Sequence, residues 1–510
     1  MLFTSYEFIA FAAILLLLYY ILPKTAQKYV LFCGNMIFYA VTGWQNLIFL
    51  FVTICTTFGA ALWVDKNLKA QKEQLALHKA DWDREQKKAY RSGEKTKRKM
   101  AVAIAAIVNV GLLAFVKFPH TQFQFLMPMG ISFYTLMSLG YLFDVYRETQ
   151  EAEKNLFRYA LFVSYFPQLV QGPISRFNEL SETLFKEHDF EGKNITFGLY
   201  RILWGFFKKL VIADRLAVAV GTISGDFGTY HGSYIFLEMF LYTIQLYADF
   251  SGGIDVTIGL SEMFGIHVTE NFIRPYFSKS LKEYWRRWHI TMSTWFRDYL
   301  FYPISITPWM QNLSRFLRKK CGERVGKRLP VYLASFIVWA VTGIWHGTTS
   351  NFIVWGIINW FILMVSEELE PLYEKFHARF IPASRRGWQA FMVLRTFTML
   401  CFLKLFDCYA TAGEVFRAFG SAFSEPNPGE VGANLFSLGL TPWDYLVAGC
   451  GALLMLGVSL LQRRESVRLQ LSKKPFALRA AVGMGLFLVT LIFGAYGVGY
   501  DASQFIYNRF

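Results

Sequence analysis

Long apolar runs limit the fold of this chain more than any other feature, because a helix needs roughly 20 apolar residues to cross a bilayer. Hydrophobic residues make up 54% of the 510 residues and aromatic residues 18%, more than soluble domains usually carry. We expect one integrated domain over 1–510, an all-α polytopic transmembrane helical bundle of about 10–13 membrane helices, some of them re-entrant. The stretches that qualify or come close are 5–22, 29–48, 47–64, 100–116, 197–220, 233–248, 331–345, 352–366, 391–406, 443–461 and 480–498.

The distribution of charge predicts the orientation of these helices. The net charge is +15, and basic residues concentrate in 65–99, 313–328 and 462–479, between apolar runs, as expected of cytoplasmic loops. The segment 409–442 has one Arg and no Lys against three Glu, which predicts an external location. The other cytoplasmic basic positions are Lys24, Lys28 and 373–386, which leaves both termini outside. We therefore expect a multi-pass protein of the cell (cytoplasmic or inner) membrane, and not nucleic-acid binding, the other interpretation of a basic chain.

Several segments depart from a simple spanning helix. The insert 65–99, rich in Lys, Glu, Gln and Ala, predicts a cytoplasmic amphipathic basic helix lying along the membrane surface. Prolines and polar residues interrupt 161–173, and an Asp closes the Ser/Thr/Tyr-rich stretch 128–146. These two segments are either re-entrant pieces around an internal cavity or kinked helices. No basic residue precedes 5–22 and no small-residue cleavage site follows it, which predicts a retained helix rather than a signal peptide.

The region 270–299 (ENFIRPYFSKSLKEYWRRWHITMSTWFRDY) cannot face lipid. It holds nine charged residues, which at bilayer centre would cost on the order of 20–30 kcal/mol together. Helical spacing predicts an aromatic stripe, which fits packing, and a polar stripe that sets an imidazole between two guanidinium groups. The aromatic stripe is Tyr284, Trp288, Met292, Trp295 and Tyr299, and the polar stripe is Arg286, His289, Ser293 and Arg297. Glu283 and Arg287 are spaced as an i,i+4 ion pair.

A second histidine stands where the chain turns between two apolar runs. His346 lies in TGIWHG (342–347), within the predicted hairpin 331–366. An ionisable residue at such a place is a functional hypothesis by default. Of the eight histidines, His289 and His346 are the two set among tryptophans in or beside membrane segments.

Other chemistries lack their motifs in this sequence. There is no P-loop, no G-x-S-x-G elbow, no H-E-x-x-H and no EF-hand loop. Six cysteines occur without a C-x-x-C pair, so we predict neither a metal site nor a redox motif. What remains is histidine-assisted group transfer inside a membrane cavity.

Segment 270–300 resembles the signature region of the membrane-bound O-acyltransferases, in the branch of the alginate and peptidoglycan O-acetylation membrane proteins. Further matching segments are PMGISFYTLMSLGYLFDVYR (128–147), LVQGPISRF (169–177), KKLVIADRLA (208–217), YADFSGGIDVTIGL (247–260), WHGTTSNFIVWG (345–356) and FIYNRF (505–510). One departure concerns the acceptor. The alginate branch continues from RDYL into a Pro-Leu-Gly-Gly turn, whereas this chain continues into FYPISIT, which weakens alginate as the acceptor.

The resemblance implies a helical fold with a central tunnel and two catalytic histidines, His289 and His346, near its narrow point. Ten further residues from the matching segments become candidate substrate-binding residues. They are Arg286, Arg297, Trp285, Trp288, Ser293, Asp298, Trp345, Asp249, Ser251 and Gln171. The resemblance also implies an acyl donor from the cytoplasm, acetyl-CoA or another acyl thioester, as a substrate with no bound cofactor. A polysaccharide would be the acceptor, and an extracytoplasmic acetyltransferase-type partner protein would complete delivery.

Acyl transfer to a hydroxyl group needs a base whose pKa lies near the working pH, and imidazole fits that requirement. We assign His346 as the general base, and His289 to orienting the donor or polarising its carbonyl group. Burial, with Arg286 acting in the same direction, is expected to lower the pKa of His289 and keep its ring neutral. Two alternatives remain open. They are D-alanyl transfer toward teichoic acid, and a membrane transporter or scramblase, which shares broken helices and buried charge.

Overall fold

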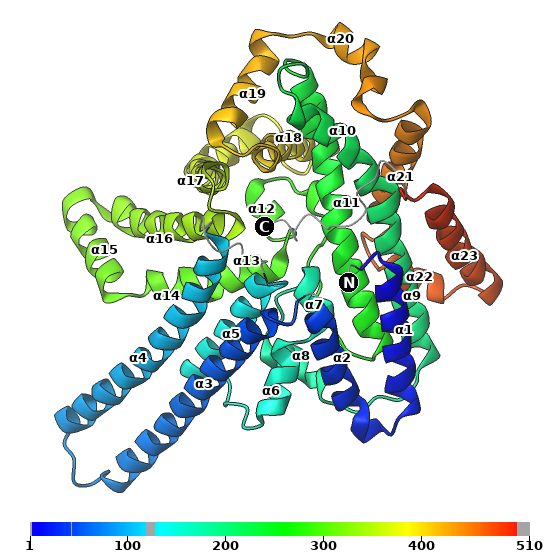
Figure 1. Cartoon of the computed structure of the whole chain (residues 1–510). Coiled ribbons are helices and arrows are strands. Elements are labelled where there is room, and N and C mark those ends of the chain that lie inside the picture. The colour runs from blue at the N-terminus through cyan, green and yellow to red at the C-terminus, as the bar shows by residue number, and fades with distance from the viewer. Residues whose placement is uncertain (1–2, 42, 119–127, 497–510) are drawn as a thin grey trace. The chain divides into compact units, whose positions relative to one another are not determined.

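Helices form nearly all the regular structure in the computed structural model of the chain (Figure 1). The structure describes residues 3–41, 43–118 and 128–496. Within those residues, the β pairing consists of an isolated antiparallel bridge between Phe272 and Trp288. The chain divides into two units. The first is formed mainly by Phe3–Ile195 and Leu260–Thr269, and the second by Thr196–Gly259 and the chain from Glu270 onward. The matching segment 505–510 lies outside the described residues.

The first unit is built on a long pair of helices, α3 and α4, that run side by side (Figure 1). Its helices are α1 (Tyr6–Ile21), η1 (Lys24–Ala26), α2 (Gln27–Val41), α3 (Asn46–Leu77), α4 (Arg84–Lys117), α5 (Ile131–Tyr146), α6 (Leu156–Val163), α7 (Phe166–Gln171) and α8 (Phe177–Leu184). The insert 65–99 forms the far ends of α3 and α4 and the turn between them. Our expectation of a single helix was wrong, because the insert forms two helix ends joined by polar bonds: Arg98 donates to the side chain of Asn67 over 2.7 Å. Whether these ends lie along the membrane surface stays a prediction.

The two interrupted segments lie in the interior of the first unit. Nearly all of α5 is buried around its whole circumference, which is why its sequence shows little helical periodicity. The segment 161–173 contains the end of α6 and the six-residue helix α7. Ser164 and Tyr165 separate these helices, and Pro167 stands in the first turn of α7, where a missing N–H is tolerated. Whether either segment is re-entrant in a bilayer stays a prediction.

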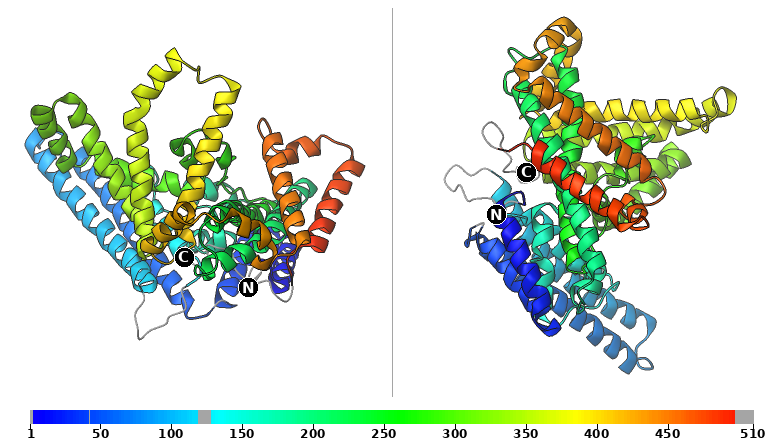
Figure 2. Two further views of the ribbon diagram at one scale, coloured as in Figure 1. Left: turned by 90° about the horizontal axis from the view of Figure 1, so that it is seen from above. Right: turned by 90° about the vertical axis from the view of Figure 1, so that its right-hand side faces the viewer.

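The second unit contains both candidate catalytic histidines. Its first helices are α9 (Gly192–Phe206), η2 (Phe207–Ala213), α10 (Asp214–Gly225) and α11 (Tyr234–Met263), of which α9 and α11 reach a few residues into the first unit. The signature region follows as η3 (Pro275–Phe277), α12 (Leu281–Trp285), α13 (Ile290–Phe296) and η4 (Arg297–Phe301). Next come α14 (Tyr302–Ser305), α15 (Pro308–Cys321), α16 (Glu323–His346), α17 (Ser350–Arg379), α18 (Arg386–Lys404) and η5 (Leu405–Asp407). The last helices, orange to red in Figure 2, are α19 (Ala412–Ser424), α20 (Pro428–Ala433), η6 (Leu435–Leu438), α21 (Pro442–Leu461), α22 (Val467–Ser472) and α23 (Phe476–Phe493).

Seven helices of the described residues are long and apolar enough to cross a membrane. They are α3, α4, α16, α17, α18 with η5, α21 and α23. The helix α1 is apolar but shorter, at 16 residues. The count is below the expected 10–13. One reason is that the apolar run 233–248 lies in α11, a continuous helix whose apolar sequence is interrupted by Glu238, Asp249 and Asp255. The fold is thus all-helical with several membrane spans, and the tunnel stays a prediction.

Candidate active site

A backbone pairing, and not a continuous helix, shapes the signature region. The N–H of Ile273 donates to the carbonyl of Arg287 over 3.0 Å, and the N–H of Ile290 donates to Asn271 over 3.1 Å. This pairing ends α12 at Trp285 and delays the next helix to Ile290. The predicted polar stripe is therefore wrong, because 286–289 are not helical and their side chains do not follow helical spacing.

The side chains of the region bear out the other sequence predictions. The five residues of the predicted aromatic stripe are all buried, as expected of packing residues. Arg287 and Glu283 form the expected ion pair over 2.5 Å. In contrast, Arg286 and Arg297 are exposed, Arg297 pairs with the neighbouring Asp298 over 2.8 Å, and Ser293 is half-buried. The guanidinium groups thus do not flank a buried imidazole.

His289 is fully buried and occupies a left-handed backbone conformation with φ 47°. Its ring is held by Asn271, whose amide nitrogen lies 3.3 Å from His289 Nδ1. The amide oxygen of Asn271 accepts hydrogen bonds from the N–H of Thr291 (3.1 Å) and from its hydroxyl (3.0 Å). The amide oxygen also lies 3.4 Å from Nδ1, but its two lone pairs are already engaged by Thr291. We therefore assign the amide nitrogen as the donor to Nδ1, which puts the proton of the neutral ring on Nε2.

The electrostatic neighbour of His289 also differs from the expected one. His289 lies outside the seven spanning helices. Burial lowers the pKa of His289 to about 3, and the ammonium group of Lys404 acts in the same direction. The ring is thus neutral at ordinary pH, as we expected, but the second cause is Lys404 and not Arg286.

His346 is the last residue of α16 and faces the start of α17. Its ring meets the Trp345 and Trp355 rings edge to face, with centroids 5.0 Å apart in both pairs. The two helices approach closely because of Gly343, where a Cβ atom would lie 2.6 Å from the carbonyl oxygen of Phe352. A glycine at the crossing point thus sets the position of His346.

Trp345 connects the two histidines. The centroid of its ring lies 6.2 Å from that of His289 and 5.0 Å from that of His346. Phe250 also packs against His289, with ring centroids 4.9 Å apart. The structure therefore brings both sequence-predicted histidines to one aromatic cluster of the second unit.

A cavity of about 20 Å³, enough for about one water molecule, adjoins His346. It is lined by Leu246, Trp285, Trp288, His346, Trp355, Lys404 and Asp407. The ammonium group of Lys404 lies 4.0 Å from the centroid of the Trp288 ring, which is a cation–π contact. Lys404 is 6% exposed and makes no ion pair within 4.0 Å with any residue that the structure describes, although the carboxylate of Asp407 lines the same cavity. A buried cation thus stands beside a candidate general base.

Of the predicted substrate-binding residues, three tryptophans belong to this cluster. Trp285 and Trp288 line the cavity, and Trp345 contacts both histidines. Trp285 also donates its indole N–H to the side chain of Asn359 over 3.2 Å, which fixes its ring.

Asp249 and Ser251 of α11 instead hold buried lysines. Asp249 pairs with Lys209 over 2.6 Å, and Ser251 accepts a hydrogen bond from Lys208 over 2.7 Å. Neither residue lines the cavity beside His346. Gln171 belongs to the first unit, where it is fully buried at the end of α7.

Sequence reasoning missed four polar residues of the cluster. Lys404 and Asp407 close a run that looks like an ordinary apolar span, and a lysine at that place is itself a functional signal. Asn271 and Asn359 orient His289 and Trp285, but no local pattern marks them, because their partners are 18 and 74 residues away.

Comparison with known proteins identifies the class of the chain. The model of the MBOAT, membrane-bound O-acyltransferase family, matches residues 153–406, a range that contains both histidines and Lys404. The probable alginate O-acetylase AlgI of Pseudomonas syringae pv. tomato is 32% identical over 389 residues, 66% of this chain and 70% of the relative. The chain therefore belongs to the membrane-bound O-acyltransferase family and is a multi-pass membrane O-acyltransferase.

The names of two other relatives refer to a different acceptor polymer or to a different acyl group. The peptidoglycan O-acetyltransferase of Helicobacter pylori is 31% identical over 326 residues, 55% of this chain and 58% of the relative. The teichoic acid D-alanyltransferase of Bacillus subtilis is 26% identical over 297 residues, 56% of this chain and 68% of the relative. Family membership assigns the chain to acyl transfer rather than to transport, and the polymer it modifies stays open.

Proposed function

We propose that this enzyme transfers an acetyl group from a thioester donor to hydroxyl groups of an exported or cell-surface polysaccharide. The observation that carries the proposal is the placement of His346 on a small cavity that also holds a buried ammonium group, Lys404. Two relatives at 31–32% identity, one named a probable alginate O-acetylase and the other a peptidoglycan O-acetyltransferase, support acetyl as the acyl group. The more distant D-alanyltransferases, at 26% identity, make D-alanine the alternative.

In the proposed reaction His346 is the general base. The acceptor hydroxyl attacks the carbonyl carbon of the thioester while the imidazole of His346 takes the hydroxyl proton. The carbon–sulfur bond then breaks, and the thiolate leaves with that proton, so the products are an ester and a thiol. The aromatic rings around His346 exclude bulk water, which disfavours hydrolysis of the thioester.

Lys404 supplies the positive charge that this reaction requires. Negative charge develops on the carbonyl oxygen as the hydroxyl adds, and a fixed cation in a water-poor site stabilises that charge. The ammonium group lies against Trp288 and lines the same cavity as His346. Lys404 can therefore stabilise the oxyanion while His346 acts as the base in attack on the same carbonyl group.

His289 is the positioning residue of the pair. Its Nδ1 faces Asn271, which leaves the Nε2–H as the donor on the other side of the ring. This N–H group suits a hydrogen bond to the carbonyl oxygen of the acyl thioester or to the hydroxyl oxygen of the polysaccharide. Its link to His346 through Trp345 supports a common site for both rings.

The donor and the partner follow from charge and length. We propose acetyl-CoA, or another acyl thioester, approaching from the side of the basic segments 65–99, 313–328 and 462–479, whose charge attracts an anionic donor. A separate extracytoplasmic protein would complete transfer to the polymer, because 409–442 is too short for a domain of typical size.

Acetyl transfer in sealed membrane vesicles of known sidedness tests the proposal. Radiolabelled acetyl-CoA supplied on the cytoplasmic face should yield labelled, alkali-labile ester in the polysaccharide fraction. His346→Ala should lower the rate at least about 100-fold, since a positioned base contributes 10²–10⁴-fold. His267→Ala is the matched control, because His267 is exposed and lies outside the cluster. Near-normal transfer by a well-expressed His346→Ala protein would end the mechanism, and label only from a D-alanyl thioester would replace acetyl with D-alanine.

A further inference from the structure

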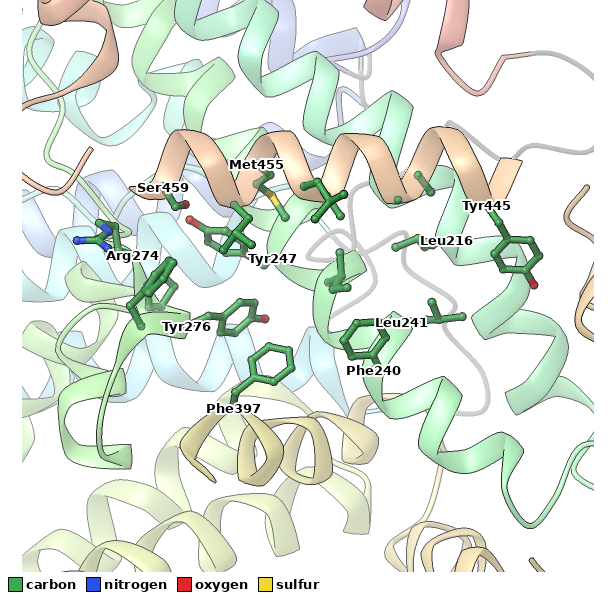
Figure 3. Close-up of a pocket in the computed structure, with 18 residues that line it drawn as sticks. Leu216, Phe240, Leu241, Tyr247, Arg274, Tyr276, Phe397, Tyr445, Met455 and Ser459 are labelled. Atoms are coloured by element: carbon green, nitrogen blue, oxygen red, sulfur yellow. The ribbon is translucent and has the colours of Figure 1, made fainter. Parts of the chain in front are cut away.

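An apolar groove of about 460 Å³ runs along α21, and the proposed acyl transfer makes no use of it. Its walls come from α10, α11, η3, α18 and α21 (Figure 3). Phe240, Tyr276 and Phe397 form one side of it, and Ala448, Gly449 and Ala452 of α21 form part of the other. Nearly all its lining residues are apolar or aromatic, so its occupant must be largely hydrocarbon.

The length and location of the groove fit a lipid chain. It extends along α21 from Tyr445 to Ser459, a separation of 14 residues that rises roughly 21 Å at about 1.5 Å per residue. That is longer than one leaflet of the hydrocarbon core, about 15 Å or half of roughly 30 Å, so the groove has room for an acyl chain and the start of its headgroup. Since α21 is one of the seven candidate spans and Leu453 is 67% exposed on it, the groove faces the space that lipid chains fill.

One end of the groove carries a positive charge, Arg274, opposite Tyr445 at the other end (Figure 3). Arg274 makes no ion pair with any residue in the described part of the chain, and its Nε has no hydrogen-bond partner there. Burial lowers the pKa of Arg274, and the positive charges of Arg287 and Arg463 act in the same direction. Arg463 lies two residues after the end of α21, so basic groups gather where a spanning helix ends.

Three buried cations of the second unit are paired with carboxylates, whereas Lys404 beside His346 is not paired with any carboxylate of the described residues. Arg201 pairs with Asp255 over 2.9 Å, Lys208 pairs with the same Asp255 over 2.6 Å, and Arg215 pairs with Asp444 over 2.8 Å. Against that pattern, Arg274 lacks an anion. The groove thus combines a hydrocarbon-lined channel with an uncompensated guanidinium group at its end.

We propose that the groove binds an anionic phospholipid, with one acyl chain along α21 and the headgroup phosphate at Arg274. A phosphate supplies the missing anion, and guanidinium groups bind phosphates through charge-assisted hydrogen bonds. A helix or second protein chain would fill the apolar part, but it would pair with Arg274 only if it carried a carboxylate at this one end. The site is independent of the acyl-transfer reaction. It would bind an anionic headgroup at the end of α21.

Native mass spectrometry of the delipidated full-length protein tests the headgroup. Phosphatidylglycerol and phosphatidylcholine with identical acyl chains are offered at equal concentration. Phosphatidylglycerol should be retained at least fivefold better, and Arg274→Gln should lower that preference about fivefold, the factor expected of one basic residue at an anionic surface. Arg318→Gln is the control, because Arg318 is exposed on α15 and does not line the groove.

Substitutions at two glycines of α21 test whether a lipid acyl chain occupies the groove. A side chain at Gly449 or at Gly457 would meet open space, but of the two only Gly449 lines the groove. Gly449→Leu should therefore lower retention of both lipids, whereas Gly457→Leu should leave retention unchanged. The two changes have the same effect on helix propensity, so they form a matched pair.

Five results would overturn the proposal. Four of them are equal retention of the two lipids by the unmodified protein, an unchanged preference in Arg274→Gln, unchanged retention in Gly449→Leu, and full competition by soluble glycerol 3-phosphate. The last would mean that Arg274 binds a free phosphate without the groove. The fifth is a dimer peak that disappears in Gly449→Leu. It would mean that a second copy of the chain, and not a lipid, occupies the groove.

Discussion

Replacing Lys404 by methionine should separate catalysis from stability. Methionine keeps an unbranched side chain against Trp288 but removes the charge beside His346. Loss of one group that stabilises an oxyanion lowers turnover about 10²–10³-fold, and we expect Lys404→Met to fall in that range.

The same change should not unfold the protein. The contact with the Trp288 ring contributes about 0.5–2 kcal/mol, whereas burying an unpaired ammonium group costs several kcal/mol. The two effects have opposite signs, so the free energy of unfolding should hold steady or rise. Lys209→Met is the matched contrast, because Lys209 is buried between Asp249 (2.6 Å) and Asp214 (2.7 Å). Stranding those carboxylates should cost about 3–5 kcal/mol.

Acetyl-transfer rates in vesicles and thermal unfolding in detergent measure the two quantities on the same preparations. Turnover of Lys404→Met within threefold of the unmodified enzyme would refute the electrophilic role. A loss of stability as large as that of Lys209→Met would show instead that Lys404 holds the fold together.

Three further outcomes follow from the site and from the charge pattern. Asn271→Ala should lower turnover at least about tenfold, because the His289 ring loses the hydrogen bond that fixes its tautomer; the rate and the pH profile check this, and an unchanged rate would contradict it. Gly343→Ala should destabilise the protein by about 1–3 kcal/mol, since its Cβ would lie 2.6 Å from a backbone oxygen of α17; an unchanged melting temperature would show that the helices can separate. Single cysteines in an otherwise cysteine-free chain should react with an impermeant reagent in intact cells at Glu425 and not at Tyr90, and the reverse pattern would invert the orientation.

The sequence allowed good prediction of what depends on local chemistry. Apolar runs gave the helical membrane class, and the break after the run 331–345 placed His346 at a helix end, where α16 stops. The spacing of Glu283 and Arg287 gave their ion pair. These features depend on residues a few positions apart, which periodicity and spacing can register.

The remaining features depend on contacts between distant residues. The polar stripe failed because Phe272 pairs with Trp288 and interrupts the helix, and no period in the sequence reports such a bridge. Lys404 comes to His346 from a helix more than 50 residues further along the chain. The prediction of a single helix over 65–99 failed for a related reason: a charged surface alone does not distinguish one helix from two helix ends that pair with each other.

The left-handed backbone at His289 means that the position is occupied at the expense of stability. A side chain with a Cβ atom in that conformation stores on the order of 1 kcal/mol, which glycine would release and asparagine would tolerate best among the others. His289→Gly should consequently relieve backbone strain, but the loss of a fully buried ring costs more, about 2–5 kcal/mol. The strain is therefore tolerated because the packing of the same ring outweighs it, and only a screen for ester formation would test the imidazole itself.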